Sequence, residues 1–218
     1  MTTTMNLQKI REELCVFLRN ANVISKAQRG VTTYTDTYTA LGAQTIFTVT
    51  QPGIKNVRSV KKNTIVLSYG GQYEVNYHEG DVQLSSSTIA GDIIAIEYDA
   101  GEGDKIYPDL PRTDIDLERY PRLGFEDISH NTTEKALNGD LLRTDVLISM
   151  VAYADKKDTV LEILSRARNA VIANRKSFFH FCYITPAGVG PMGQSAGRAD
   201  KIVQKNQDFR IPFIYETG

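Results

Sequence analysis

The sequence predicts an α+β protein, in which a mixed or antiparallel sheet with flanking helices is joined to an all-β, sandwich-like module. Helical spacing of apolar residues occurs near the N-terminus and again after residue 155, whereas strand-like alternation and turn residues fill residues 30–100. Strand patterns also occur on both sides of the second helix. We therefore expect a discontinuous α+β domain of residues 1–29 and 101–218, with residues 30–100 as an inserted β module.

The first predicted element is an amphipathic helix from about Met5 to Asn20, with Thr4 as its N-cap. Its apolar residues recur three and four positions apart, which places them on one face. They are Leu7, Ile10, Leu14, Phe17 and Leu18. A polar joint, Ser25 to Gly30, follows this helix and leads into the β module.

Short strands separated by turns are predicted for the β module. Gly70-Gly71 and Glu79-Gly80-Asp81 stand where hairpins need positive φ. The alternation of Tyr73, Val75 and Tyr77 with polar residues indicates a strand with one apolar face. The predicted strands are Thr45 to Thr50, Val57 to Lys61, Thr64 to Tyr69, Tyr73 to Tyr77, Val82 to Ser85, and Ile93 to Tyr98.

The C-terminal half begins with a predicted loop, Asp99 to Asp116, and then alternates strands with one helix. The strand Asp145 to Tyr153 is apolar on both faces, which is typical of a central strand. The helix after it is expected to be capped by Asp155, with Asp158 in its first turn. Its core stripe is Val160, Ile163, Leu164, Ala167, Ala170 and Val171. The remaining predicted strands are Leu123 to Ser129, Phe178 to Thr185, and Asp208 to Glu216.

Composition excludes several classes of protein. The chain has 218 residues with 25 basic and 26 acidic side chains, so its net charge of -1 gives no field that would attract nucleic acid or an anionic membrane. No apolar run has the length of a membrane span, and the polar N-terminus does not resemble a signal peptide. The separated cysteines, Cys15 and Cys182, predict no disulfide framework and fit a reducing compartment.

One glycine-rich segment matches the letters of a dinucleotide-binding loop. It runs Gly188-Val189-Gly190-Pro191-Met192-Gly193 after a predicted strand. A cofactor site of this kind needs a helix directly after the loop, but residues 194–200 have no helical periodicity. We interpret Thr185 to Asp200 instead as a long, mobile hairpin loop, and loops of this length are usually functional or disordered.

Metal ligands and catalytic groups are not grouped in the sequence. His180 and Cys182 share one face of a predicted strand, but no second pair completes a zinc site and no group orients the imidazole as a base. Four aspartates lie close together in the predicted loop, but they lack the spacing of a calcium-binding loop. We interpret them, Asp104, Asp109, Asp114 and Asp116, as a solvated acidic linker. We therefore expect no metal, no cofactor and no enzymatic activity.

Two parts of the sequence resemble bacteriophage structural proteins. The first part consists of the N-terminal helix, the strand Thr144 to Tyr153, the helix Asp158 to Ala173 and the closing strand Asp208 to Phe213. In pattern and order, these elements resemble the tail terminator (tail completion, neck) proteins of tailed bacteriophages. Residues 34–49, 73–77 and 91–98 look like a small β-sandwich module that recurs in phage structural proteins.

The resemblance implies a virion structural protein without a membrane partner. It would be assembled in the host cytoplasm into a homo-oligomeric, hexameric ring at the head-proximal end of the tail tube. Such a ring ends tail polymerisation during viral tail assembly and performs head-tail joining, with the tail tube protein and the head-tail connector or stopper protein as partners. Genomic DNA would pass through its lumen without sequence-specific binding.

The glycine-rich segment is our candidate interface with the tube or connector. The residues are Gly188, Gly190, Met192, Gln194 and Arg198. Two alternatives stay open. One is another neck component, such as a head-tail stopper or adaptor, and the other is a carbohydrate- or receptor-binding protein that uses Tyr34, Tyr38 and Tyr69 as stacking surfaces.

Overall fold

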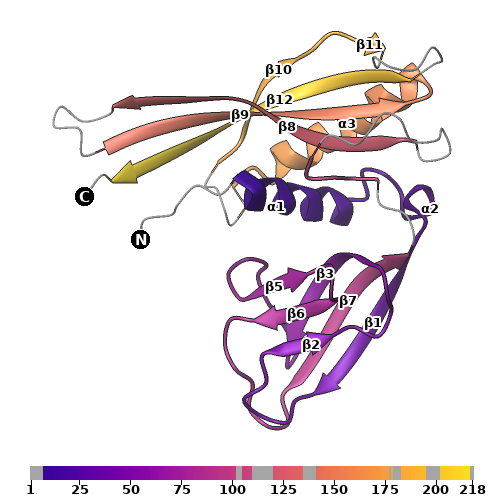
Figure 1. The fold of residues 1–218 in the computed structure, drawn as a ribbon, viewed down its shortest axis with the longest axis vertical. Coiled ribbons are helices and arrows are strands. Elements are labelled where there is room, and N and C mark those ends of the chain that lie inside the picture. The colour runs from indigo at the N-terminus through magenta and orange to yellow at the C-terminus, as the bar shows by residue number, and fades with distance from the viewer. Residues whose placement is uncertain are drawn as a thin grey trace. The chain divides into compact units, whose positions relative to one another are not determined.

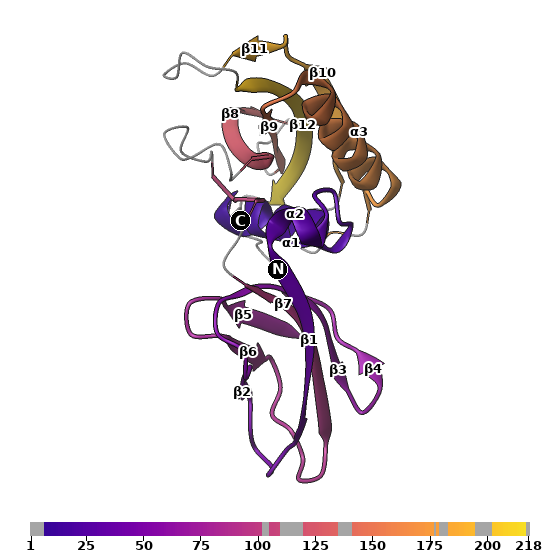
Figure 2. The same cartoon turned by 90° about the vertical axis from the view of Figure 1, so that its right-hand side faces the viewer.

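The computed structural model describes residues 7–101, 105–109, 120–134, 141–176, 178, 183–194 and 202–216. The chain divides into two compact units, Met1–Ile24 with Lys105–Gly218 (the larger unit) and Ser25–Asp104 (the β unit). Figures 1 and 2 show the helices and sheets of each. The described strands pair antiparallel in all three sheets, so the expected α+β class with antiparallel sheets is confirmed.

The larger unit contains one sheet with the strand order β10-β12-β9-β8, and β11 also pairs with β12. Three of its strands are long, at 13 to 14 residues each, and Figure 1 shows them extending past the helices. The elements are α1 (Leu7–Asn20), β8 (Arg122–Glu134), β9 (Leu141–Ala154), α3 (Lys157–Ala173), β10 (Thr185–Val189), β11 (Gly193–Gln194) and β12 (Val203–Glu216).

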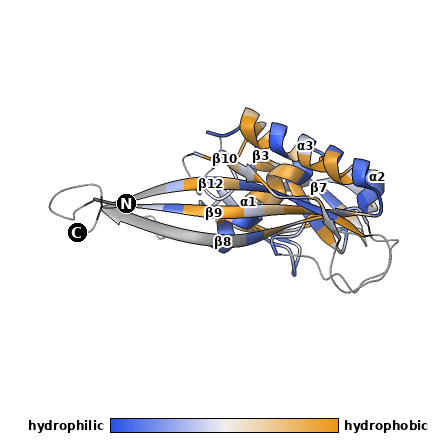
Figure 3. Ribbon diagram, turned by 90° about the horizontal axis from the view of Figure 1, so that it is seen from above, coloured by the Kyte–Doolittle hydropathy of each residue, from blue (hydrophilic) through white to orange (hydrophobic). Residues whose placement is uncertain are grey.

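The core of the larger unit lies between one face of this sheet and the two helices. Alternate residues of β9, from Val146 to Ala154, are buried with apolar side chains of α1 and α3 in one cluster. Figure 3 shows the apolar stretches along α3 and along the middle of β9 and β12. The pairing of β9 with both β8 and β12 confirms the predicted central strand.

Helix α3 matches its predicted core stripe but not its predicted start. Val160, Ile163, Leu164, Ala167 and Val171 are buried, and Ala170 is half-buried. The N-cap residue is Lys156, which makes no capping hydrogen bond, so the expected Asp155 cap is wrong. The predicted Thr4 cap of α1 lies outside the described residues.

The β unit consists of two sheets around one core. The orders are β1-β7-β3-β4 and β2-β6-β5. Tyr98 of the first sheet and Phe47 of the second belong to the same buried cluster. The elements are α2 (Lys26–Arg29), β1 (Val31–Thr39), β2 (Ile46–Thr48), β3 (Ile54–Lys62), β4 (Ile65–Val66), β5 (Tyr73–Asn76), β6 (Asp81–Leu84) and β7 (Ile93–Gly101).

Both predicted glycine turns of the β unit contain a glycine with positive φ, but one of the two forms a hairpin. Gly80 has φ 77° and joins β5 to β6 as a hairpin, whereas Gly70 has φ 76° but joins strands that pair with different partners. Two predictions are corrected. Asp99 and Gly101 belong to β7 and not to a loop, and the strand expected from Thr64 to Tyr69 is reduced to β4.

The segment expected to be a polar joint contains a short helix. Ser25 accepts a hydrogen bond from the Gln28 amide, and the Gln28 side chain accepts one from the Ser25 amide, which together form a capping box. Gly30 ends α2 in the left-handed conformation, with φ 66°. The sequence Ser25-x-x-Gln28 with a following glycine was the signal for this helix.

Candidate functional site

The predicted interface residues lie beside strand β12. Gly188 is in β10, Gly190 and Met192 follow it, and Gln194 is in β11. Both short strands pair with β12, so the expected long loop is wrong for residues 185–189 and 193–194. Met192 packs against the core, and Arg198 lies outside the described residues.

Gly190 lies directly over Asn206 of β12. Its amide donates a 3.2 Å hydrogen bond to the Asn206 carbonyl. A Cβ atom at this position would overlap Asn206 Oδ1, whereas one at Gly188 would make only an ordinary contact, 3.6 Å from Asp208. The glycine at position 190 therefore allows the backbone to pack closely against the Asn206 side chain. This role differs from that of the glycines in a dinucleotide-binding loop, which let the backbone approach a phosphate.

A polar network on the outer sheet face fixes the Asn206 side chain. Its Nδ2 donates to Ser149 Oγ at 3.1 Å and to Asp208 Oδ1 at 2.8 Å. Ser149 Oγ also donates to Asp208 Oδ1, at 2.7 Å. Because each contact restrains the next, these side chains are held in place before any partner binds.

A groove of about 380 Å³ lies over this network. Its floor comes from β9 and β12, while Pro191 and Gly193 of the predicted interface segment form part of its wall. The lining residues are Glu126, Ser149, Val151, Tyr153, Pro191, Gly193, Gln204, Lys205 and Asn206. The groove is therefore lined by the apolar side chain of Val151 and by amide, hydroxyl, carboxylate and amine groups.

The groove contains both ionisable and neutral polar side chains. Burial raises the pKa of Tyr153, and the nearby Glu126 and Tyr120 raise it further, so this phenol stays neutral at physiological pH. Ser149 Oγ donates to the Asp208 carboxylate, and the ionisable side chains among the described lining residues are Glu126, Lys205 and Tyr153. The lining groups are suited to hydrogen bonds with polar groups of a partner.

The sheet that carries the groove has one long edge, on β8, that no described strand covers beyond Leu123. β8 pairs with β9 along its length, and its other side meets only the short bridge between Leu123 and Ile106 in the described part of the chain. From Gly124 to Glu134, no described strand covers this edge. Unpaired edges of this kind are templates for pairing with another chain.

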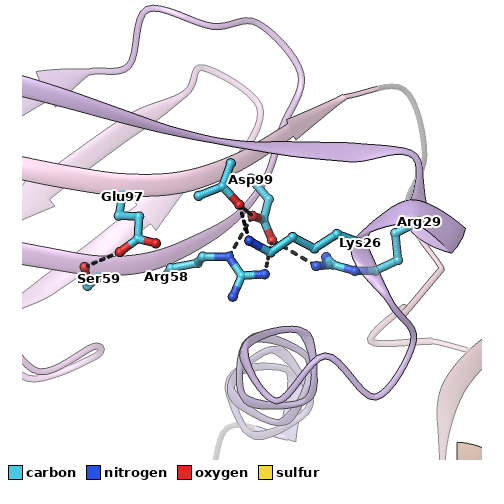
Figure 4. A network of polar contacts seen from close by, with 7 residues as sticks. Lys26, Arg29, Arg58, Ser59, Glu97 and Asp99 are labelled. Carbon is cyan, nitrogen blue, oxygen red and sulfur yellow. Dashed lines mark hydrogen bonds and ion pairs between the residues drawn. The ribbon is translucent and has the colours of Figure 1, made fainter.

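A buried ion cluster in the β unit was not predicted from the sequence. Asp99 accepts from Arg58 Nε at 2.7 Å, from Arg29 at 2.9 Å and from Thr33 at 2.7 Å, and Lys26 donates to Thr33. Figure 4 shows these side chains converging on Asp99 from α2, β1 and β3. Burial alone would raise the pKa of Asp99, but the hydrogen bonds outweigh it and lower the pKa. The cluster ties α2 to the sheet.

A scan against protein-family models and a search of curated proteins give no match to this sequence.

The acidic residues and the His–Cys pair considered as metal ligands are described only in part by the structure. Asp109 forms a 2.7 Å ion pair with Arg11 of α1, while Asp104, Asp114, Asp116, His180 and Cys182 lie outside the described residues. In the described ranges, no group of three His, Cys, Asp or Glu side chains could hold a metal ion. None of the described helices has the length and apolar character for crossing a membrane.

The three tyrosines considered for stacking differ in exposure. Tyr34 is exposed, but Tyr38 is half-buried and its hydroxyl donates to the Thr48 carbonyl at 2.6 Å. Tyr69 is half-buried as well and packs edge-on against Tyr73. A stacking surface for a sugar needs an open ring face. Of the three, only Tyr34 is exposed enough for this.

Proposed function

We propose that this protein is a virion structural protein that forms a ring at the head-proximal end of a phage tail tube. The ring stops tail polymerisation and joins the tail to the head connector. The order of helix, long central strand, helix and closing strand supports this proposal, because the sequence of these elements resembles tail terminator proteins. The β unit is then a sandwich-like module inserted after the first helix.

The free edge of β8 carries the proposal. A ring needs a surface on each copy that binds the next copy, and the β8 edge from Gly124 to Glu134, which no described strand covers, offers main-chain hydrogen bonds for this purpose. The opposite edge of the sheet is formed by β10, so the two edges are different surfaces. Head-to-tail pairing of unlike surfaces closes into a ring when the rotation between copies permits.

The groove and the segment around Gly190 are the proposed contact with the tube or connector. The Ser149–Asn206–Asp208 network presents fixed polar groups there, and Pro191 and Gly193 line the same groove. The near-neutral charge of the chain suits a lumen through which DNA passes, because strong phosphate binding would slow its passage.

Deleting the gene from its virus tests the proposal. Without a terminator, tails should polymerise past their normal length and remain separate from heads, which negative-stain electron microscopy would record. Expression of the protein from a plasmid is the control and should restore normal, joined tails. Normal-length tails that fail to join would instead identify another neck component, and normal, joined tails would contradict both functions.

Light scattering of the purified protein is a second, independent measurement. A ring has a mass that is a fixed multiple of 24.3 kDa, and the resemblance implies six copies. Two single variants, Thr132→Pro and Thr133→Pro, probe the β8 edge. The amides of successive strand residues point to opposite edges, so one variant disturbs pairing with β9 and the other disturbs only the free edge. The variant that keeps its fold should lose the ring.

A further inference from the structure

The part of the sequence that contains the second half of α3 has basic residues but no acidic ones. From Ile163 to Ala199, none of the 37 residues is aspartate or glutamate, although the chain contains 26 acidic residues among its 218. The basic residues of this stretch are Arg166, Arg168, Arg175, Lys176 and Arg198. The net charge of -1 for the whole chain therefore hides a local excess of positive charge.

The structure gathers most of these cations on one exposed side of α3, which we call the basic face. It consists of Ser165, Arg168, Asn169, Arg175 and Lys176, and all five are exposed. Their spacings of three, four, seven and more residues place them on the same side of a helix, and the last two directly follow its end. The opposite side of α3 packs into the core.

The charges of the basic face are not neutralised within the described part of the chain. Arg166, beside the face, is paired with Glu162, but no described carboxylate pairs with the three cations of the face itself. Arg175 lies over the ring of Tyr183, 5.4 Å from its centroid, and this contact leaves its charge in place. The C-terminal end of a helix contributes only about -0.5 charge, so most of the positive charge remains available to a partner.

The side chains of the basic face are those that bind phosphate groups of nucleic acids. Arginine and lysine neutralise phosphates, and serine and asparagine donate hydrogen bonds to them. The face extends for about 15 Å, at 1.5 Å per helical residue. One strand of duplex DNA presents about four phosphates over this distance, because they follow one another every 3.4 Å along the axis. The three cations can therefore contact successive phosphates of one strand.

An anionic membrane is less complementary to this face. A helix that lies on a bilayer buries large apolar side chains between its cations. The five side chains of the basic face are all polar. The large apolar residue that α3 exposes, Leu161 at 39%, lies on the other half of the helix between Asp158 and Glu162. These carboxylates would be repelled by an anionic lipid surface.

We propose that the basic face of α3 binds the phosphate backbone of duplex DNA. The contact does not read the base sequence, because phosphates carry no sequence information. Three cations make it weak and sensitive to salt, with log affinity falling by about 2.7 per unit of log salt concentration. A weak contact is compatible with DNA that moves past the protein. The inference goes beyond the proposed ring, because it concerns a surface that each copy carries by itself.

Fluorescence anisotropy of a fluorescein-labelled DNA duplex, titrated with the full chain, tests this proposal. We expect wild type to bind, and its affinity to fall at least about 40-fold between about 50 and 200 mM salt. The variant Arg168→Gln/Arg175→Gln/Lys176→Gln should lose the binding at low salt. Arg168→Lys/Arg175→Lys retains the charges and should still bind. An unchanged thermal midpoint checks that each variant is folded.

A second triple variant controls for net charge. Lys61→Gln/Lys157→Gln/Arg210→Gln removes the same charge from exposed positions outside the basic face and should bind DNA like wild type. Equal losses in the two triple variants would overturn the proposal. So would a wild type that does not bind the duplex at about 50 mM salt, including one that binds only phosphatidylcholine–phosphatidylglycerol vesicles. DNA binding without a ring, or a ring without DNA binding, would separate failure of the proposed function from failure of this inference.

Discussion

The hydroxyl of Tyr98 donates a 3.0 Å hydrogen bond to Asp36 Oδ2 at the middle of β1. Asp36 also accepts from the Thr50 amide at 2.7 Å and from Thr50 Oγ1 at 3.0 Å. Burial alone would raise the pKa of Asp36, but these bonds lower it. β1 is an edge strand, and an inward-pointing charge is one of the devices that keep such an edge from pairing with other chains.

Replacing Asp36 by alanine should destabilise the protein. The buried Tyr98 hydroxyl and the Thr50 amide would lose their acceptor, at a cost of about 1–3 kcal/mol in the free energy of unfolding. Urea denaturation measures this change. The matched control is Thr35→Ala, an exposed neighbour on β1, which should change stability by less than about 0.5 kcal/mol. Equal effects of the two variants would contradict a structural role for Asp36.

Asp99→Asn should be more damaging. The substitution leaves the buried Arg29 and the adjacent Arg58 without their shared carboxylate, and removal of one partner from a buried ion pair typically costs about 3–5 kcal/mol. Glu97→Gln, two residues earlier on β7, is the control because the hydrogen bond of the Glu97 side chain within the described residues is a long one, 3.4 Å from Ser59 Oγ. Urea denaturation should separate the two variants, and a small loss for Asp99→Asn would show that the arginines find other partners.

The β unit should lose stability in acid. The hydrogen bond from Lys62, aided by those from the Ile89 amide and Asn63, lowers the pKa of Asp92 to about 2. A carboxyl group whose pKa is lower in the folded than in the unfolded chain stabilises the fold above the unfolded pKa, about 3.9, and this contribution is lost as the pH falls. We expect the free energy of unfolding to fall between about pH 4 and pH 2. Asp92→Asn should make this fall shallower, and an unchanged slope would contradict the assignment.

Gly190→Ala should disturb the groove, whereas Gly188→Ala should be tolerated. The first substitution places a methyl group on Asn206 Oδ1, and overpacking of this kind typically costs about 1–3 kcal/mol. Asn206→Ala removes the atom that is struck, so the double variant Gly190→Ala/Asn206→Ala should recover part of the loss. Thermal denaturation of the four proteins gives the coupling energy. Additive effects would mean that the two residues do not interact.

Regular apolar patterns were the part of the fold that could be predicted. The stripe from Val160 to Val171 and the two-sided strand around Ile148 are both found, because burial on a helix face or in a central strand leaves a direct pattern in the sequence. The positive φ of Gly80 was predictable for a similar reason, since a tight hairpin demands it.

The parts of the fold that could not be predicted depend on contacts between residues that are far apart in the sequence. β1 is composed mainly of threonine and tyrosine, so its register with β7 rather than apolar alternation makes it a strand. β10 was mistaken for a loop because its glycines suit turns, and only pairing with β12 reveals their role. Asp99 was expected to begin the loop Asp99 to Asp116, but it lies in β7 and pairs with Arg29 and Arg58, which are 70 and 41 residues away in the sequence.

The register between β1 and β7 has a consequence for how the β unit is attached. Val31 is paired with Gly101, and Gly101 packs so closely on the Gly30 carbonyl that a side chain would not fit. The two ends of the unit therefore leave it side by side. A segment with adjacent ends can be gained or lost by a host chain at a single surface loop, without separating the residues that flank the insertion. We therefore expect joining Ile24 to Lys105 through a short linker to leave a larger unit that folds by itself.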